Sequence, residues 1–595
     1  MNRVMAYKVE SKRVGPALWT GACVALALLA GCARTAPPKL AEAPGIDRAD
    51  APAVATQSVF GDYLAGQFAQ HDHDYGAAAE YLGRALAVEP DNLDLQRRTF
   101  LLLVSEGKMD RALPLAQRLS GRGVSNDAGI GLADLVLLVE HVKAGDDAAP
   151  AAARLPDEGL LRFATPMIVA WTDIGDHDLN GALKALDRFD KMQGFESLKA
   201  LHSALIDDFA GQDAAASGLY KKMLTGDRLN WRVVDMAGNF YERHNRVGDA
   251  KALYERFAQE NADTASLVEP SLARIAAGQV PPPRIAGIKD GLAEALFDVA
   301  SLLNQRETQD LALLYGRLSL ELKPNLALAQ MLVAEIAEGQ DRFDEALAEY
   351  RAVEPDSPFS WIARLRSAEV LDNLGRSGEA AAELKSLAAD RANSSQPLIE
   401  LGDMLRGHNQ FPEAVTAYDG AIARIGSVAP EHWSVFYSRG IALERSGQWP
   451  RAEADFLHAL ELQPDQPLVL NYLGYSWIEK GQHLDRALTM IQRAVELRPD
   501  DGYIVDSLGW AFYQVGKYPE ATKFLERAIE LLPQDPTIND HLGDAYWQSG
   551  RYAEARFQWR RALQFSPEPD EIKDLEAKLD KGLVRPGAVS SAGGG

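Results

Sequence analysis

The chain has 595 residues, of which 47% are hydrophobic and 25% are charged, and these values are typical of folded proteins rather than disordered ones. The net charge of -23 argues against nucleic acid as a partner, because binding there requires lysines and arginines that neutralise phosphates. It argues equally against electrostatic adsorption to an anionic membrane. The chain is too long to fold around one hydrophobic core of ordinary size, and its composition favours helices. We therefore expect several all-α domains or a repeat array.

The first 31 residues have the pattern of a secretory signal peptide. A basic start is followed by the hydrophobic stretch "PALWTGACVALALL", which is too short to span a bilayer, and then by "LAGC", Leu29–Cys32. This ending resembles the bacterial lipobox, and the resemblance implies that Cys32 becomes the first residue of the mature chain and carries the lipid. Ala33 and Arg34 follow, where an aspartate commonly retains such proteins in the inner membrane, so the resemblance implies the outer membrane. The alternative is a plain signal peptide with an incidental cysteine.

Two segments rich in proline punctuate the rest of the chain. Residues 33–57 are rich in alanine and proline and lack helical periodicity, which indicates an extended tether. The stretch "GQVPPPRIAGIKDG" cannot be helical at its three consecutive prolines and marks a boundary between two arrays. The predicted layout is a signal peptide at 1–31, a tether at 32–57, a degenerate N-terminal repeat array at 58–264, a Pro-rich break at 265–292, a C-terminal repeat array at 293–569, a capping helix at 570–584 and a disordered tail at 585–595.

Three consecutive segments near the C-terminus repeat one pattern: Pro467–Asp501, Gly502–Asp535 and Pro536–Pro569. Each has a Leu-Gly pair, an aromatic residue three positions later, two alanines and a closing proline. In the middle segment the small residues are Gly509 and Ala521, which allow two helices to cross closely, and Pro533 ends the second helix.

A 34-residue period with this pattern resembles the tetratricopeptide repeat. The resemblance implies helix–turn–helix units that stack into a right-handed superhelical solenoid, an all-α fold of about a dozen repeats in two arrays. Weaker units with the same period precede the three clear ones, at Trp433–Gln466 and Ser395–Val428, near Trp361, Ala327 and Ala293, and in degenerate form between residues 59 and 264.

Motifs of common catalytic sites are missing from the sequence, which lacks HExxH, GxSxG and GxxxxGK. "SEGK" (Ser105–Lys108) matches SxxK, and "HDHD" (His71–Asp74) could bind a divalent metal, but both are expected in turns between repeat helices, where polar residues are common. We therefore expect no enzyme, no metal and no cofactor. The alternative of a different class is an enzyme whose site lies in residues 120–290, the part least like a repeat.

One helix of the middle repeat carries two stripes of side chains. Val505, Gly509 and Phe512 are expected to face the partner helix, and a second stripe lies about 100° round the helix. In tetratricopeptide arrays the second stripe lines a concave groove. The predicted binding surface consists of this stripe and the equivalent or adjacent residues of neighbouring repeats, namely Tyr437, Asn471, Tyr472, Tyr475, Asp506, Trp510, Tyr513, Asp540, His541, Asp544 and Trp547.

An aromatic and acidic groove would bind an extended basic or apolar protein segment, because tyrosine and tryptophan dominate binding hot spots and carboxylates repel a free carboxylate. The alternative is that some of these rings pack against the next repeat or the capping helix.

The sequence thus predicts a lipid-anchored scaffold, facing the periplasm from the outer membrane, that binds proteins and not nucleic acid. This plan resembles tetratricopeptide lipoproteins of the NlpI and LbcA types, which bring carboxyl-terminal processing proteases to cell-wall hydrolases. The alternative within the binding class is an assembly factor for pili, secretin or exported polysaccharide. The sequence does not predict an oligomeric state.

Overall fold

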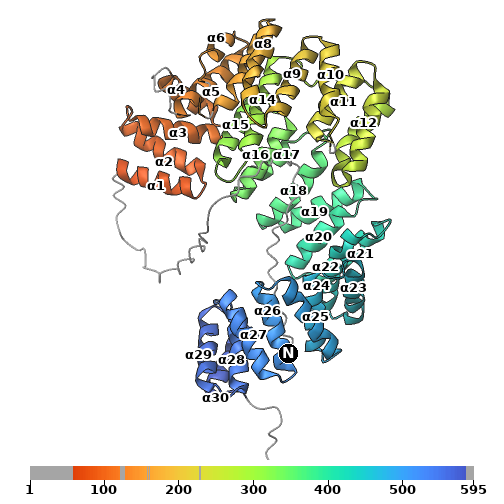
Figure 1. Cartoon of the computed structure of the whole chain (residues 1–595). Coiled ribbons are helices and arrows are strands. Elements are labelled where there is room, and N and C mark those ends of the chain that lie inside the picture. The colour runs from red at the N-terminus through yellow and green to blue at the C-terminus, as the bar shows by residue number, and fades with distance from the viewer. Residues whose placement is uncertain (1–57, 121–127, 157, 160, 227–228, 584–595) are drawn as a thin grey trace, which may run out of the picture. The chain divides into compact units, whose positions relative to one another are not determined.

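The computed structural model describes residues 58–120, 128–156, 158–159, 161–226 and 229–583 (Figure 1). These residues form α-helices joined by turns and short 3₁₀ segments, with no strand among them. No helix in the described ranges combines the length and the hydrophobicity that crossing a bilayer requires. The predicted signal peptide, Cys32, the tether and the C-terminal tail lie outside the described residues.

The chain divides into two compact units between Ala380 and Ala381, here called the N-terminal unit and the C-terminal unit. The α-helices of the N-terminal unit are α1 (Val59–His71), α2 (Tyr75–Val88), α3 (Leu93–Ser105), α4 (Met109–Leu119), α5 (Ala128–Ala144), α6 (Ala149–Ala152), α7 (Thr165–Gly175), α8 (Leu179–Leu186), α9 (Glu196–Phe209), α10 (Asp213–Met223), α11 (Trp231–Arg243), α12 (Val247–Glu260), α13 (Glu269–Ala276), α14 (Ile288–Leu303), α15 (Gln309–Leu322), α16 (Ala327–Gly339), α17 (Phe343–Ala352) and α18 (Ser360–Asn373).

The division falls within α19 (Ser377–Asp390). The C-terminal unit continues with α20 (Gln396–Gly407), α21 (Phe411–Arg424), α22 (Trp433–Arg445), α23 (Trp449–Leu462), α24 (Pro467–Glu479), α25 (Leu484–Leu497), α26 (Gly502–Gln514), α27 (Tyr518–Leu531), α28 (Pro536–Gln548), α29 (Tyr552–Gln564) and α30 (Pro569–Lys581). Successive helices pack as pairs, and each pair packs on the next.

The small residues of the repeat pattern lie where the two helices of a pair cross. A Cβ atom on Gly509 would lie 2.6 Å from Cγ of Leu525, and one on Gly543 would lie 2.4 Å from Nε1 of Trp559. Ala521 is fully buried, and α27 ends two residues before Pro533. The packing role that the sequence assigns to these residues is therefore confirmed.

The Pro-rich break is non-helical between Ala276 and Ile288, but α13 lies within the predicted range of 265–292. Helices from the two sides of the break pack on each other, because α14 contacts α7 and α15 contacts both α3 and α5 (Figure 1). The break therefore does not separate two compact units, and the division occurs only after Ala380.

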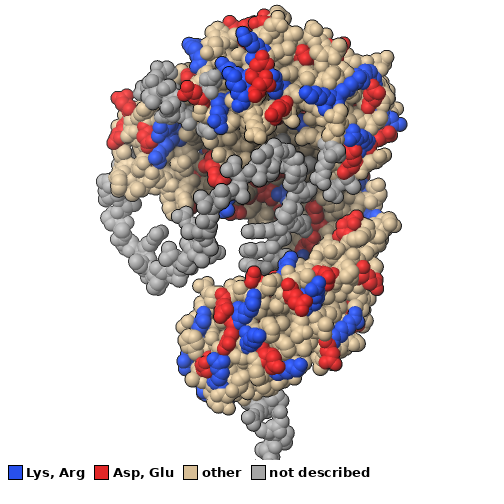
Figure 2. Space-filling view, viewed as in Figure 1, with Lys and Arg blue, Asp and Glu red and all other residues tan. Residues whose placement is uncertain are grey.

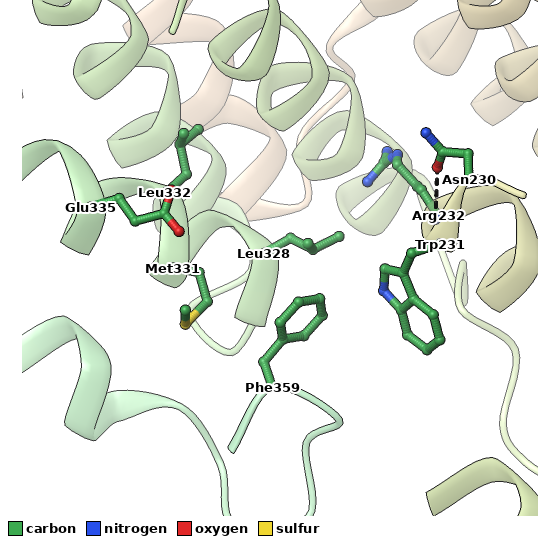
Figure 3. A pocket seen from close by; sticks show the side chains of 8 residues that line it. All are labelled: Asn230, Trp231, Arg232, Leu328, Met331, Leu332, Glu335 and Phe359. Atoms are coloured by element: carbon green, nitrogen blue, oxygen red, sulfur yellow. Dashed lines mark hydrogen bonds between the residues drawn. The ribbon is translucent and has the colours of Figure 1, made fainter. Parts of the chain in front are cut away.

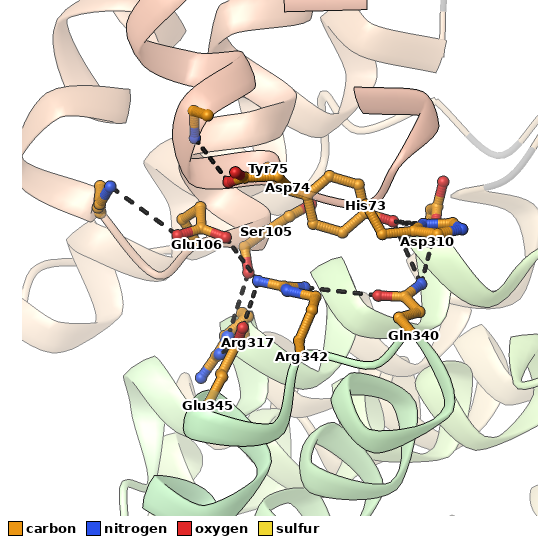
Figure 4. Close-up of polar contacts among 12 residues, drawn as sticks. His73, Asp74, Tyr75, Ser105, Glu106, Asp310, Arg317, Gln340, Arg342 and Glu345 are labelled. Carbon is orange, nitrogen blue, oxygen red and sulfur yellow. Dashed lines mark hydrogen bonds and ion pairs between the residues drawn. The ribbon is translucent and has the colours of Figure 1, made fainter. Parts of the chain in front are cut away.

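Polar contacts join the first repeats to later repeats of the same unit (Figure 4). Oη of Tyr75, at the start of α2, donates to Oδ1 of Asp310 at 2.6 Å and accepts from Nε2 of Gln340 at 3.2 Å. The guanidinium of Arg342 lies 4.6 Å above the Tyr75 ring, and its Nη2 pairs with Glu106 at 2.5 Å. Repeat units usually contact only their neighbours, so these contacts over more than two hundred residues make the unit more than a simple stack.

Charged side chains of both signs are interspersed over the described surface that Figure 2 shows. Many of them form ion pairs between exposed groups, such as Arg493 with Asp465 at 3.0 Å. Exposed pairs of this kind contribute little to stability, so the fold depends on its apolar helix interfaces.

Candidate functional site

The predicted binding surface begins with Asp506 on α26, and the structure buries it. Asp506 has an exposed fraction of 0%, and Nδ1 of His541 on α28 donates to both of its carboxylate oxygens at 3.0 Å. His541 is itself buried. This carboxylate therefore joins two successive repeats and does not face solvent.

Trp510 lies one turn further along α26 and is only 5% exposed. Its ring stacks on His541, with centroids 4.0 Å apart, and on Tyr513 at 4.7 Å. Its Nε1 donates to Oε1 of Glu479 on α24 at 2.9 Å. Trp510 thus contacts the repeats on both sides of its own, which is the packing role that the sequence analysis left open as an alternative.

The two aspartates of α28 are committed to the capping helix. Nζ of Lys578 on α30 donates to both oxygens of Asp540, at 2.6 and 2.8 Å, and to Asp544 at 3.0 Å. Asp544 also accepts from Nε1 of Trp559 at 3.0 Å. All four side chains are buried. A lysine buried in the capping helix therefore neutralises the last carboxylates of the stripe.

Trp547 also packs at this end of the chain. Its ring is half-buried, lies 5.3 Å from the ring of Trp559 and 4.6 Å from that of Tyr552, and is covered by Gly582 after α30. A Cβ on Gly582 would lie 1.9 Å from Cζ2 of Trp547, and the residue has a positive φ of 70°, so only glycine fits. This contact with the capping segment is again the packing alternative.

The remaining predicted residues are buried to different degrees. Asn471 and Tyr437 are buried, and the Tyr437 ring meets that of Tyr472 edge to face at 6.1 Å. Tyr472, Tyr475 and Tyr513 are half-buried and present part of their rings at the surface. Burial raises the pKa of Tyr513 to about 12.

The expectation of an acidic surface needs correction, because the structure buries Asp506, Asp540 and Asp544 with their partners. The reason is physical: a carboxylate on the face between repeats loses its hydration and must find a donor within the fold. What this surface still offers a ligand is aromatic, in Tyr472, Tyr475, Tyr513 and Trp547, here called the aromatic stripe. Binding by these residues stays a prediction.

The two motifs of possible chemistry lie in turns, as expected. Ser105 ends α3, and its carbonyl accepts from Nε of Arg317 at 3.2 Å. His73 has a positive φ of 58°, and Asp74 caps α2 by accepting from the Ala77 amide at 2.9 Å. Both turns dock the first repeats onto α15–α17 (Figure 4). Within the described residues, no group of three or more His, Cys, Asp or Glu could hold a metal.

A buried network of hydrogen bonds involves residues 120–290, where an enzyme site was the alternative prediction. Nε1 of Trp171 donates to Nδ1 of His202 at 3.1 Å, so Nε2 of His202 carries the proton and donates to Asp298 at 2.9 Å. Asp298 also accepts from Nη2 of Arg232 at 2.9 Å, and Nη1 of Arg232 pairs with Glu294 at 2.8 Å. These contacts tie α7, α9, α11 and α14 together. Since His202 is fully buried, the pair of His202 and Asp298 has no access to a substrate.

The N-terminal unit has a pocket that Arg232 of this hydrogen-bond network helps to line (Figure 3). Apolar side chains form most of its wall, and the carboxyl of Glu335 lies at the end opposite the indole of Trp231, with Leu328 and Phe359 between them. The full lining is Asn230, Trp231, Arg232, Leu328, Met331, Leu332, Glu335 and Phe359. The ring of Trp231 meets that of Phe359 edge to face at 6.2 Å.

Glu335 differs from the other charged residues of this region. Its neighbour Glu338 accepts from Oη of Tyr350 at 2.9 Å and pairs with Arg366 at 2.8 Å, and Arg366 also pairs with Glu369 at 2.7 Å. Glu335 has no hydrogen bond or ion pair with any residue that the structure describes, although the charge of Arg366 acts on it. Burial, together with the charge of Glu338, raises its pKa to about 7 despite the opposing effect of Arg366.

This pocket was not predicted from the sequence, although one signal for it exists. Leu328, Met331, Leu332 and Glu335 recur at i, i+3, i+4 and i+7, so a carboxylate interrupts the apolar face of a helix. The other wall comes from residues about a hundred positions earlier, which no local pattern places beside α16.

The fold and these sites define a helical repeat protein whose paired helices stack through apolar faces. Family models described as tetratricopeptide repeats match residues 329–397, 399–467, 509–550 and 536–569. These segments are tetratricopeptide repeats, and the predicted all-α solenoid of such repeats is confirmed. No curated protein matches the chain.

Solved structures with helical repeats align over long stretches at low similarity. The Cut9 and Hcn1 complex of the APC/C has 16% identity, covering 89% of this chain and 97% of that chain, with a TM-score of 0.36. Yeast Tom70 has 14% identity, covering 88% and 95%, with a TM-score of 0.34. YrrB, described as a TPR protein with an unusual peptide-binding site, has 22% identity over 33% of this chain and 97% of its own, with a TM-score of 0.27.

Proposed function

We propose that the chain is a scaffold that binds proteins through the aromatic stripe of the C-terminal unit, anchored by lipid to the outer membrane and facing the periplasm. The observation that supports binding is that Tyr472, Tyr475, Tyr513 and Trp547 stay half-buried on α24, α26 and α28, the first helices of three successive helix pairs. Tyrosine and tryptophan give large contact areas at low entropic cost and are enriched in hot spots. With the carboxylates neutralised inside, an apolar segment fits this stripe better than a strongly basic one.

The test of the stripe is capture of partners by variants that keep the fold. Replacing Tyr475 and Tyr513 by serine is expected to weaken capture by about 10- to 100-fold, since each hot-spot ring contributes on the order of 1–2 kcal/mol. The matched control is Phe557→Ser, because Phe557 is a ring 55% exposed on α29, the second helix of its pair, and does not belong to the stripe. If the double variant of Tyr475 and Tyr513 captures partners as well as Phe557→Ser and the native chain do, the stripe is not the binding surface.

The anchor rests on "LAGC" and on Cys32, outside the described residues. Cys32→Ala is expected to abolish labelling by radioactive palmitate and to move the protein from the outer-membrane to the soluble periplasmic fraction. Cys23→Ala, in the hydrophobic segment, is the control and should leave labelling unchanged. Lipid labelling that persists without Cys32, or a cytoplasmic location of the native chain, would contradict the anchor.

The partner we propose is a carboxyl-terminal processing protease or a cell-wall enzyme, which follows from the resemblance to the NlpI and LbcA types. Affinity purification from detergent extracts is expected to recover such a protein with the native chain and not with the Tyr475 and Tyr513 variant. Recovery of pilus, secretin or polysaccharide-export components in its place would support an assembly factor.

A further inference from the structure

The pocket of the N-terminal unit combines an apolar wall with one carboxylate that lacks a partner in the fold. Of its two charged lining residues, Arg232 is already held by Glu294 and Asp298 at 2.8 and 2.9 Å. Glu335 has no such partner among the described residues, and the cation whose charge acts on it, Arg366, is paired with Glu338 and Glu369. The pocket therefore carries an uncompensated negative charge when Glu335 is ionised.

An unpaired carboxylate at a partly buried position is costly, because burial removes water without replacing its hydrogen bonds. A methionine or leucine at position 335 would continue the apolar face of α16 set by Leu328, Met331 and Leu332. The carboxylate is thus unexplained by packing, whereas Glu338, one turn on, is explained by Tyr350 and Arg366. A ligand that brings a cation would provide the missing partner.

We propose that this pocket binds an amphipathic cation, an ammonium or guanidinium group on an apolar chain, with the cation at Glu335 and the apolar part against Leu328, Phe359 and Trp231. Figure 3 shows this polarity, with the carboxyl at one end and the indole at the other. An anion is disfavoured because Arg232 is occupied, and a purely apolar ligand would leave the carboxylate unpaired. The proposal does not depend on the aromatic stripe, which lies in the other unit.

The group has two natural sources, a lysine or arginine side chain in a protein segment and a free amphipathic amine. Calorimetry with the full-length chain separates them by using hexylammonium chloride, a capped Leu-Arg-Leu peptide and 1-hexanol as the neutral analogue. We expect hexylammonium to bind at least about tenfold more tightly than hexanol, because one charge-assisted contact to a carboxylate is worth on the order of 1.5–3 kcal/mol. Tighter binding of the peptide than of hexylammonium identifies a protein segment, and the reverse order identifies a small amine.

The pH provides a readout that a merely structural role would not move. Because burial raises the pKa of Glu335 to about 7, only about a tenth of the carboxyl is ionised at pH 6, and hexylammonium should bind roughly tenfold more weakly there than at pH 8. The charged groups that act on Glu335 are Arg366 and Glu338, and burial raises the pKa of Glu338 as well, so the pH dependence is assigned to Glu335 only if Glu335→Gln removes it.

Glu335→Gln is expected to remove both the preference for hexylammonium over hexanol and the pH dependence. The control is Asp356→Asn, which removes an exposed carboxylate just before Phe359 without touching the pocket. Hexylammonium and hexanol binding equally to the native chain, no binding by any of the three probes, or equal behaviour of the two variants would overturn the proposal.

Discussion

In the C-terminal unit, Asp506, Asp540 and Asp544 each accept hydrogen bonds from a buried donor, whereas Glu335 in the N-terminal unit faces an apolar pocket without one. All four carboxylates lie on first helices of repeats. Pairing within the fold turns the first three into structural contacts, Asp506 with the next repeat and Asp540 and Asp544 with the capping helix, whereas the fourth has no such contact. A carboxylate on a repeat surface therefore indicates a binding site only after the fold's own donors have been accounted for.

Among the carboxylates that have a buried donor, the largest loss of stability is expected from Lys578→Met. Methionine preserves the volume of the side chain but leaves Asp540 and Asp544 buried without their cation, which costs about 3–5 kcal/mol. The loss should be local, because repeats are stabilised mainly by their neighbours. Hydrogen exchange is therefore expected to speed up in α28–α30 and not in α20–α22.

Lys573→Met serves as the control, since Lys573 is exposed on the same helix. If the two variants exchange alike, Lys578 is not what holds the capping helix, and the buried pair has no structural role.

Trp510→Ala comes next, with an expected cost of about 3 kcal/mol, because it removes a ring stacked between His541 and Tyr513. Hydrogen exchange in α24, α26 and α28 should report it, since Trp510 contacts all three helices. Tyr513→Ser is expected to cost less, because that ring is only half-buried. Equal stability of the native chain and Trp510→Ala would restore Trp510 as a residue free to bind.

The repeat pattern alone predicted the helices of the C-terminal unit, because Gly509, Ala521 and Pro533 act through contacts within one pair of helices. It failed to predict the fate of Asp506, because that depends on His541 in the next repeat, and of Asp540, because that depends on Lys578 in the capping helix. The sequence predicted correctly which helix face carries Asp506 and Asp540. It did not predict that His541 and Lys578 pack against that face and pair with them.

The packing of the N-terminal unit was harder to predict, because its contacts join residues that are even further apart in the sequence. Arg342 reaches Glu106, and Trp231 meets Phe359, over more than a hundred residues. Such contacts follow from how the helices curve back on one another, which no local periodicity encodes. This is why the pocket around Glu335 could not be foreseen from a pattern of small and large residues.

The lack of a partner for Glu335 predicts that the stability of the fold depends on pH. The folded pKa of Glu335, about 7, lies above its ordinary value of 4.5, so the folded state binds more protons between these two pH values and its stability falls as the pH rises through them. Glu335→Gln lacks this penalty and should gain about 2 kcal/mol over the native chain between pH 4.5 and pH 8, a value reduced because the carboxyl is partly exposed. Urea denaturation at both pH values, with Asp356→Asn as the reference, measures the difference, and a gain that does not change with pH would show that Glu335 finds a partner in solution.

Tyr75→Phe gives the smallest expected effect and tests whether the pairing rule also holds in the N-terminal unit. Asp310 there resembles Asp506, because Oη of Tyr75 donates to it at 2.6 Å, and the pKa of Tyr75 is raised by burial and by this hydrogen bond. Removing the hydroxyl should cost about 1–2 kcal/mol, since Asp310 keeps a second donor in Gln340 at 3.2 Å. The exchange of α2 and α15 should quicken, while that of α11 and α12 stays unchanged. Tyr81→Phe, on the same helix, provides the reference, and if it matches Tyr75→Phe, then the hydrogen bond from Tyr75 to Asp310 does not help to hold α2 in place.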